Sequence, residues 1–567
     1  MPFFQTRRAR AFGPGALLSA VFLTACGGSD DALPQLPAAS PASLLSCTDL
    51  AAKIAFANTT ITAATSMPAG TVTVAGKPVG EHCRVTGRMH DRVSAVDGQS
   101  YAIGFEMRLP KSWNGRFYYQ ANGGIDGNVS AALGATGGGP LDNALNMGFA
   151  VLSSDAGHAG SLGPFFGIDP QARLDYGYQA VGKLTPMAKS AIQTAYGKGP
   201  DRSYIGGCSN GGRHTMVAAA RYADHYDGFL VGNPGTRLPL AAIANIAGAQ
   251  KYATLATTAG DLGTGFTAAE RTLVSNAVLA RCDLLDGTSD GLVQDTSACQ
   301  AAFQLDRDVP TCSGARNGSC LSAAQKSAIG SLFTGATTST GARIYTSFPY
   351  DAGLHTAGWA QWKFTFPIAL DSGAVGFIWQ VPPESPATFN GATFALTGNV
   401  DTMLAKVNAT NATYTESALS FMTPPNPSNL SVLKGRGAKM MLYHGTADPI
   451  FSSDDTTGWY EALRGANNGD ASNFSRFFRV PGMNHCAGGP SADQFDMLTP
   501  LVNWVEKGQA PDSVVASARG TGNAGGVNAD VPASWSAART RPLCPYPKVA
   551  RYKGSGDLES AASFSCQ

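Results

Sequence analysis

Charged residues are scarce in this chain of 567 residues, of which only 14% are Asp, Glu, Lys or Arg. The two signs nearly cancel, because 41 Lys and Arg face 40 Asp and Glu and leave a formal net charge of +1. No basic region is therefore present to attract a nucleic acid, and no acidic tail suggests a solvated end. The sequence also lacks internal repeats, heptad runs and a nucleotide-binding glycine loop. We expect a globular protein with no nucleic-acid partner and no organic cofactor.

The N-terminal apolar stretch, Ala16 to Ala25, is too short to remain in a membrane as a span. Three arginines precede it, a composition typical of an export signal: Arg7, Arg8 and Arg10. We therefore predict that residues 1–26 are a signal peptide and that the protein is exported.

The signal segment ends on Leu23-Thr-Ala-Cys26, which resembles a bacterial lipobox, where the cysteine becomes the lipidated first residue. This motif predicts a lipid anchor at Cys26 and an outer-membrane lipoprotein. The alternative is plain secretion with cleavage nearby, which places the protein in the periplasm or outside the cell. Gly27 follows in place of Asp, so no signal for inner-membrane retention is present. Residues 27–46, rich in Ser, Pro and Ala, are expected to form a flexible tether.

Without Cys26, ten of the eleven cysteines remain, an even number in a compartment that favours disulfides. Counting alone does not settle how they pair. Local spacing suggests four pairs: Cys47 with Cys83, Cys282 with Cys299, Cys312 with Cys320, and Cys544 with Cys566. Cys208 and Cys486 are left over. A bond between them would hold their Cα atoms about 6 Å apart, and with them the neighbouring residues Ser209 and His485.

Strand and helix patterns alternate through residues 47–235, which favours an α/β fold built on a mostly parallel sheet. The rhythm breaks at Asn233-Pro-Gly235, and Ala-rich helical stretches follow up to residue 437. The α/β pattern then resumes over residues 438–567. We predict one core in two parts with residues 236–437 inserted as a lid domain.

The chain is organised around Ser203-Tyr-Ile-Gly-Gly-Cys-Ser-Asn-Gly-Gly-Arg-His214, which predicts a strand, a sharp turn and a helix with Ser209 at the apex. A bare Gly-x-Ser-x-Gly match is weak in a chain so rich in Gly and Ser. A serine nucleophile also needs a base and a carboxylate that orients the base. Asp448 and His485 follow later in the chain, each on a loop after an expected strand, so the order is nucleophile, acid, histidine.

Together, three motifs resemble those of the tannase and feruloyl esterase family, which includes mono(hydroxyethyl) terephthalate hydrolases: Gly207-Cys-Ser-Asn-Gly-Gly-Arg213, Gly445-Thr-Ala-Asp448 and Asn484-His-Cys486. The resemblance extends from Cys47 to Cys566. It implies an α/β-hydrolase core, a lid over the active site, and hydrolysis of small aromatic esters of feruloyl, galloyl or hydroxyethyl terephthalate type through an acyl-enzyme. It also implies the Cys208–Cys486 disulfide.

Site roles follow from the same resemblance. Ser209 is expected to be the nucleophile, His485 the general base and acid, and Asp448 its orienting partner. The oxyanion hole is expected to consist of the backbone N–H groups of Asn210 and Gly124, with Gly123 as an equally placed candidate.

An acidic loop, Cys282-Asp-Leu-Leu-Asp-Gly-Thr-Ser-Asp-Gly-Leu292, carries three carboxylates, and hard oxygen ligands on a flexible turn suit Ca²⁺. The resemblance implies as ligands the side chains of Asp283, Asp286 and Asp290 and the carbonyls of Thr288 and Leu292. We expect a structural calcium ion far from the chemistry. The alternative is a solvated Asp/Gly turn.

Four lid aromatics offer surfaces for an aryl ring, with core packing as the alternative: Trp359, Trp362, Phe377 and Trp379. Between residues 359 and 402 the only cation is Lys363. Because an arginine in the lid binds the free carboxylate in the terephthalate half-ester hydrolases, we expect uncharged or phenolic esters to be preferred here. Lys363, or an arginine from elsewhere in the fold, is the alternative clamp.

Two other functions fit the same sequence. A serine peptidase would use the same fold and triad, and a non-catalytic surface lipoprotein would bind polyphenols without releasing an acid. The complete triad favours the esterase. We expect the protein to act as a monomer.

Overall fold

The computed structural model describes residues 33–567, so the predicted signal peptide and the lipidation site at Cys26 lie outside the described residues. A nine-stranded sheet forms the centre, in the order β13-β12-β11-β10-β8-β9-β6-β5-β2. From first to last along the chain these strands are β2 (Thr59–Met67), β5 (His82–Val93), β6 (Ser100–Pro110), β8 (Arg116–Gln120), β9 (Ala150–Ser154), β10 (Arg202–Cys208), β11 (Gly228–Gly232), β12 (Lys439–Gly445) and β13 (Ser475–Val480).

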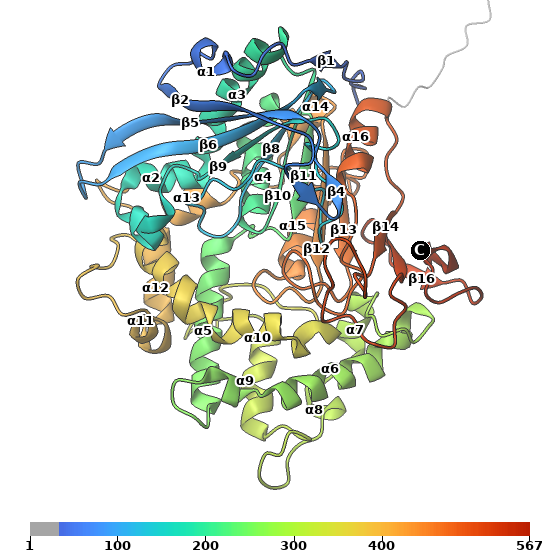
Figure 1. Cartoon of the computed structure of the whole chain (residues 1–567). Coiled ribbons are helices and arrows are strands. Elements are labelled where there is room, and N and C mark those ends of the chain that lie inside the picture. The colour runs from blue at the N-terminus through green and yellow to red at the C-terminus, as the bar shows by residue number, and fades with distance from the viewer. Residues whose placement is uncertain (1–32) are drawn as a thin grey trace, which may run out of the picture.

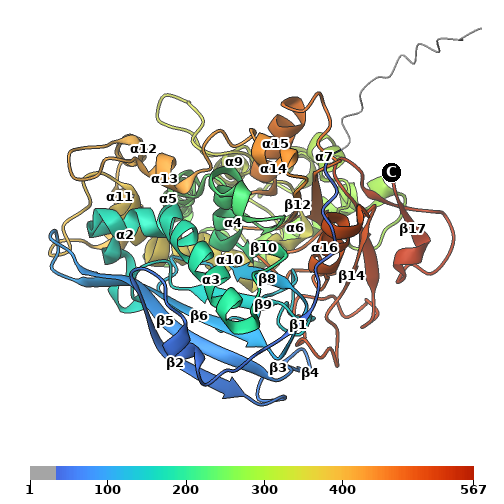
Figure 2. The same cartoon turned by 90° about the horizontal axis from the view of Figure 1, so that it is seen from above.

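The six strands from β13 to β9 run parallel, and the last three join antiparallel. Figure 2 shows β2, β5 and β6 together at one edge of the molecule. The sheet is therefore mostly parallel, as predicted. Since β12 pairs directly with β11, the chain leaves the sheet after β11 and returns beside it more than two hundred residues later.

Alternate residues of the central strands enter two apolar clusters, because successive side chains of a strand point to opposite faces. One face packs on α3 (Ala180–Tyr196), α4 (Asn210–Arg221) and α15 (Ser453–Gly465) through Phe117, Ile205, Phe229 and Met440. The other face packs on α16 (Leu498–Lys507) through Tyr118, Tyr204, Leu230 and Met441. Both faces are covered, as a parallel sheet requires.

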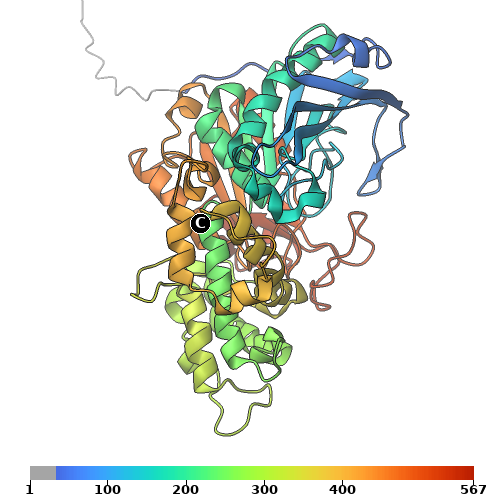
Figure 3. The same ribbon diagram turned by 90° about the vertical axis from the view of Figure 1, so that its left-hand side faces the viewer.

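Residues 236–437 are helical and project from one end of the core (Figures 1 and 3). Their helices are α5 (Leu238–Leu255), α6 (Ala268–Cys282), α7 (Thr296–Ala302), α8 (Leu305–Asp308), α9 (Ala323–Phe333), α10 (Ala357–Phe364), α11 (Gly391–Thr397), α12 (Val400–Asn408), α13 (Ala418–Met422) and α14 (Ser431–Gly435). The last of these, α14, packs on the core, since Leu433 is buried in the same apolar cluster as residues of α3.

Short elements complete the molecule: α1 (Leu50–Lys53), α2 (Pro170–Leu174), β1 (Ala42–Ser43) with β7 (Ser112–Trp113), β3 (Thr73–Val74) with β4 (Lys77–Pro78), β14 (Val514–Ser517) with β15 (Thr540–Leu543), and β16 (Ala550–Tyr552) with β17 (Phe564–Cys566). Within residues 33–567, no helix combines the length and apolar character that a membrane span requires.

The expected flexible tether is wrong for residues 33–46, which lie along the core. Ala42 and Ser43 pair with β7. The backbone N–H of Ala39 donates to the Glu506 carboxylate at 3.0 Å, and Ser40 donates to Asp201 at 2.8 Å. The composition of this segment suggested a tether. The residues that hold it on the core are remote in the sequence, so composition could not reveal them.

Candidate active site

Ser209 occupies the tip of the turn between β10 and α4, with φ 66° and ψ −128°, a backbone conformation rare for a residue with a side chain. A Cβ atom added to Gly207 or to Gly211 would lie 2.3 Å from the carbonyl oxygen of Ala121. Neither position has room for a side chain. The two glycines of the motif are thus needed because the end of β8 approaches the turn so closely.

His485 connects Ser209 to Asp448. Its Nε2 lies 2.8 Å from Ser209 Oγ, and its Nδ1 lies 2.8 Å from Asp448 Oδ2. With Nδ1–H donating to the carboxylate, Nε2 is left as the acceptor of the serine hydroxyl. The three side chains come from the loops that follow β10, β12 and β13, so the parallel sheet brings its carboxyl ends together at one site.

Asp448 is buried and fully engaged. The N–H groups of Ile450 and Phe451 donate to Oδ1 at 2.9 and 3.1 Å, and the Asn233 amide donates to Oδ2 at 2.7 Å. Burial by itself raises the pKa of Asp448, but His485 and His444 outweigh it and hold that pKa well below its ordinary value. Asp448 is therefore ionised, the form that orients and stabilises an imidazolium.

Sequence reasoning missed two of these supports. Asn233 directly follows β11, a strand that the sequence analysis did not identify. His444 is buried beside Asp448, at 3.3 Å, and its ring is held by Thr456 at 2.8 Å and by the carbonyl of Phe451 at 2.9 Å. Its place at the end of the strand that was expected before Asp448 was the available signal.

The Cys208–Cys486 disulfide is present, with the two Cα atoms 6.0 Å apart. It joins the residue before the serine to the residue after the histidine. The four pairs suggested by spacing also form, with Cα atoms 5.0–5.5 Å apart. All five predicted disulfides are confirmed.

The expected oxyanion donors border Ser209. Asn210 is the first residue of α4, where backbone N–H groups point out of the helix. A Cβ on Gly123 would lie 3.7 Å from Ser209 Cβ, so Gly123 is the direct neighbour of the serine. Gly124 follows it with φ 64° and open space on its Cβ side.

Two aromatic rings flank His485. The Trp362 centroid lies 5.2 Å from the imidazole centroid, and that of Phe451 lies 5.4 Å from it, both edge to face. Trp362 was expected at the site. Phe451 was not, although its position three residues after Asp448 on the same loop was a usable signal.

The other three aromatics lie elsewhere. Phe377 and Trp379 are 0% and 2% exposed, so the expectation that they face a substrate is wrong. Phe377 packs between Phe165 and Phe389, and Trp379 belongs to the apolar cluster around α5. Trp359 packs against Phe266 and Phe364.

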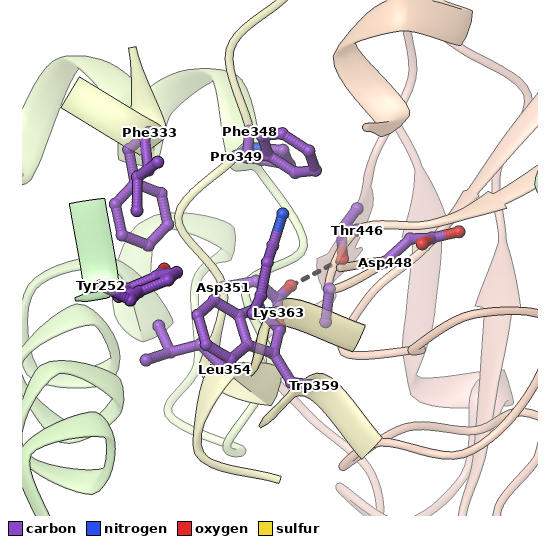
Figure 4. Close-up of a pocket in the computed structure, with 12 residues that line it drawn as sticks. Tyr252, Phe333, Phe348, Pro349, Asp351, Leu354, Trp359, Lys363, Thr446 and Asp448 are labelled. Atoms are coloured by element: carbon purple, nitrogen blue, oxygen red, sulfur yellow. Dashed lines mark hydrogen bonds between the residues drawn. The ribbon is translucent and has the colours of Figure 1, made fainter. Parts of the chain in front are cut away.

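Behind Asp448 lies a small cavity of about 30 Å³, lined by Tyr252, Phe333, Phe348, Leu354, Trp359 and Lys363 (Figure 4). The Lys363 ammonium lies 4.0 Å from the ring centroid of Phe348 and donates to Asn245 at 3.3 Å. Burial lowers the pKa of Lys363 to about 8. The Lys363 ammonium therefore has its partners inside the protein, where residues 236–437 meet the core.

The acidic loop brings its three aspartates close together. Asp283 accepts from the N–H groups of Asp290 and Gly291, both at 3.0 Å, and Asp290 accepts from Arg541 at 2.9 Å. Burial, then Asp290 and Asp283, raise the pKa of Asp286 to about 7, and its Oδ2 is buried without a hydrogen-bond partner.

Side chains alone do not make this loop a metal site. Within residues 33–567 no group of three or more His, Cys, Asp and Glu converges as metal ligands. The oxygen donors, their like charges and the orphaned Asp286 oxygen do suit a hard cation, with carbonyls completing the shell. Leu292, at the end of the loop, packs on the segment between β13 and His485, since its Cδ2 lies 3.4 Å from a Cβ built on Gly482.

Known proteins resemble this chain over most of its length. The family model "Tannase and feruloyl esterase" matches residues 83–567. The chain is 39% identical over 547 residues to the mono(2-hydroxyethyl) terephthalate hydrolase of Piscinibacter sakaiensis, covering 90% of this chain and 89% of that protein. It is 27% identical over 550 residues to a probable feruloyl esterase B of Emericella nidulans, covering 92% and 94%.

Solved structures show the same fold. Feruloyl esterase B from Aspergillus oryzae has a TM-score of 0.73 at 25% identity, covering 92% of this chain and 99% of that chain. The tannin acyl hydrolase of Aspergillus niger has a TM-score of 0.69 at 20% identity, covering 93% and 96%. The predicted α/β-hydrolase core is confirmed.

Proposed function

Because the chain belongs to the tannase and feruloyl esterase family, we propose that it hydrolyses esters of aromatic acids through an acyl-enzyme on Ser209. Its relatives make it a carboxylic ester hydrolase. The observation that carries the mechanism is the pair of 2.8 Å contacts from His485 to Ser209 and to Asp448. Feruloyl, galloyl and hydroxyethyl terephthalate esters are the candidate substrates.

In the first half-reaction, Ser209 Oγ attacks the ester carbonyl carbon while His485 Nε2 takes the hydroxyl proton. The C–O bond to the alcohol then breaks, and His485 returns the proton to the leaving oxygen. Water repeats the sequence on the acyl-serine and releases the acid. Asp448 keeps the imidazole in the required tautomer and stabilises it when charged.

The negative charge that develops on the carbonyl oxygen is assigned to two backbone N–H donors. Asn210 supplies one from the start of α4, and Gly124 or its neighbour Gly123 supplies the other. Preorganised donors of this kind are worth about 10²–10³-fold in rate each.

The acyl group is assigned to the side of His485 where Trp362 lies, because Trp362 is only partly buried and its ring contacts the imidazole. Lys363 lies over Phe348 in the interior, which supports a preference for uncharged or phenolic acyl groups over a free carboxylate. The test compares kcat/KM for mono- and bis(hydroxyethyl) terephthalate and methyl ferulate. A strong preference for the mono-acid overturns this part of the proposal.

A hydrolysis screen separates the esterase from its rivals. The panel contains methyl ferulate, methyl gallate, both terephthalate esters and a peptide, each with the wild type and Ser209→Ala. Ester cleavage by the wild type alone supports the proposal. Preferred peptide cleavage indicates a peptidase, and saturable binding of the aromatic compounds without acid release indicates a binding protein.

For the acidic loop, calcium binding is proposed through the Asp283, Asp286 and Asp290 side chains with the Thr288 and Leu292 carbonyls. The ion would neutralise three neighbouring carboxylates and fix the loop. Chelation is expected to lower the melting temperature, Ca²⁺ but not Mg²⁺ to restore it, and kcat at saturating substrate to stay unchanged below melting. Absence of calcium in elemental analysis, together with no shift on its addition, would show an empty turn.

Export is supported by the five disulfides, which form in oxidising compartments. A lipid on Cys26 and a monomeric state are proposed in addition. Mass spectrometry of the membrane-associated protein tests the lipid: a diacylglycerol adduct on Cys26 is expected, and a free N-terminus beyond residue 26 contradicts it.

A further inference from the structure

We propose that Asp126 is a positioning residue that locks together the two loops of the oxyanion hole, an inference that rests on the proposed esterase function. Asp126 lies two residues after Gly124, and Asn210 directly follows Ser209. The Asn210 side-chain amide donates to Asp126 Oδ2 at 2.8 Å. One hydrogen bond thus joins the two segments that are assigned the N–H donors.

A second donor reaches the same carboxylate oxygen. His214, one turn along α4 from Asn210, places Nε2 at 2.8 Å from Asp126 Oδ2. The side chains of Asp126 and His214 are 1% and 4% exposed, so water does not compete for these bonds. Two contacts from one helix face fix both the position and the direction of the carboxylate.

Arg213 completes the cluster from the other side. Its guanidinium donates to Asn210 Oδ1 at 2.6 Å and to His214 Nδ1 at 3.1 Å. Burial and Arg213 hold the pKa of His214 well below its ordinary value, so the ring is neutral, with Nδ1 accepting and Nε2–H donating. Burial raises the pKa of Asp126 well above its ordinary value, although Arg213 opposes the rise. Arg213 thus reaches the Asp126 carboxyl group through Asn210 and the neutral ring of His214, and both ends of the Asn210 amide are used.

The loop from Gly123 to Gly127 needs such a lock, because three of its residues have positive φ: 64° at Gly124, 57° at Asp126 and 87° at Gly127. Its backbone is also tied to the core: His158 donates to the Ile125 carbonyl at 2.8 Å, and Tyr176 to the Gly124 carbonyl at 3.3 Å. These two ties lead to segments other than the nucleophile turn. Asp126 is the residue of this loop whose side chain bonds to the turn itself.

A small displacement between the loops matters because an oxyanion hole works only when both donors point at the developing charge. Loss of the Asp126 link is therefore expected to affect the transition state more than ground-state binding. It lowers kcat while KM changes little.

The test measures kcat, KM and melting temperature for Asp126→Asn and Asp126→Ala on an ester that the wild type hydrolyses. Asparagine tolerates positive φ and keeps one acceptor oxygen, whereas alanine keeps neither. We expect kcat to fall about 10-fold for Asn and about 100-fold for Ala, with KM within about threefold. Binding of an arylboronic acid, which mimics the tetrahedral intermediate, should weaken in parallel.

The matched control is Glu506→Gln. Glu506 has a side chain 1% exposed, accepts from Arg116 and Tyr204, and lies at the opposite end of the strands. Its variant should lose melting temperature but keep kcat within about twofold. Equal loss of kcat in the control and in Asp126→Asn overturns the proposal, as does wild-type kcat in a folded Asp126→Ala or a loss confined to KM.

Should both Asp126 variants fail to fold, His214→Phe serves instead, because phenylalanine keeps a ring but has no N–H donor. It removes one of the two donors on the carboxylate and is expected to lower kcat several-fold with unchanged KM, whereas wild-type kcat contradicts the proposal. If the wild type itself hydrolyses no aromatic ester, the proposed function fails, and this outcome is distinct from a failure of the Asp126 inference.

Discussion

Gly211 shows how strictly the nucleophile turn is determined by single residues. A Cβ at this position would lie 2.3 Å from the Ala121 carbonyl oxygen, a backbone atom that cannot move aside cheaply. The same carbonyl restricts Gly207, so the turn and the end of β8 fit only without side chains between them.

We therefore expect Gly211→Ala to displace Ser209, with large losses of both activity and melting temperature. The control is Gly458→Ala in α15, where a Cβ meets nothing within 4 Å. That exposed helical position should gain about 0.5–1 kcal/mol, since alanine has the higher helix propensity. Thermal melts and ester assays of both variants check the prediction, which fails if Gly211→Ala retains normal turnover.

The negative charge of Asp448 can be removed without changing the size of its side chain. Asp448→Asn keeps the size of the side chain but reverses the hydrogen bond that sets the His485 tautomer, so kcat should fall about 10⁴-fold. A circular dichroism spectrum verifies the fold. A loss of less than tenfold in a folded variant would show that Asp448 does not orient the base.

At the scale of elements, the Cys208–Cys486 disulfide crosslinks the β10 turn to the loop after β13 across 278 residues. The Cys312–Cys320 disulfide closes only 8 residues within the lid. The chain-entropy model assigns about 5.6 kcal/mol to the first and about 2.5 kcal/mol to the second, as upper estimates.

Replacing Cys208 and Cys486 together by serine should thus lower both the melting temperature and kcat, because the bridge also positions Ser209 and His485. Replacing Cys312 and Cys320 should lower only the melting temperature. The comparison uses kcat measured well below both melting points. Unchanged kcat in the first pair would reduce the bridge to a purely stabilising role.

Lys363 on α10 makes stability depend on pH. Its pKa falls from 10.5 to about 8 on folding because of burial, although Asp448 and Asp371 oppose the fall. Below pH 8 both states carry the proton, and the folded state bears the full cost of the buried charge. Between about pH 8 and 10.5 the unfolded chain binds more protons, so stability rises with pH relative to a variant without this amine.

The melting temperature of the wild type, minus that of Lys363→Met, should therefore increase from pH 8 to pH 10. Thermal melts of both proteins across this range give the difference directly. Parallel curves would mean that Lys363 is not desolvated by the fold.

The sequence predicted those parts of the site whose signals lie within a short stretch of the chain. The turn at Ser209, the strand before Asp448 and the strand before His485 each carry their own pattern of apolar residues, glycines and polar ends. Asn233 was missed because its strand, β11, is five residues long and precedes the apparent break in the chain. Phe377 and Trp379 were placed wrongly because aromatic composition does not tell a lid core from a substrate surface.

At the scale of the whole molecule, one sheet and one inserted helical domain meet at the carboxyl ends of parallel strands. The chain leaves after β11 and returns at β12, so the helices of residues 236–437 lie at the end of the sheet that holds Ser209, Asp448 and His485 (Figure 1). Trp362 and Lys363 of α10 contact this end from the lid side.

The central claim is that Ser209 is the nucleophile of an aromatic ester hydrolase, and an aryl phosphonate ester tests it most directly. Attack by the active serine forms a stable analogue of the tetrahedral intermediate on its oxygen. We expect peptide mapping by mass spectrometry to find one phosphonyl group per chain, on Ser209, with ester hydrolysis lost in proportion to labelling. Full inactivation with the label on another residue, or hydrolysis that persists after Ser209 is modified, would contradict the account.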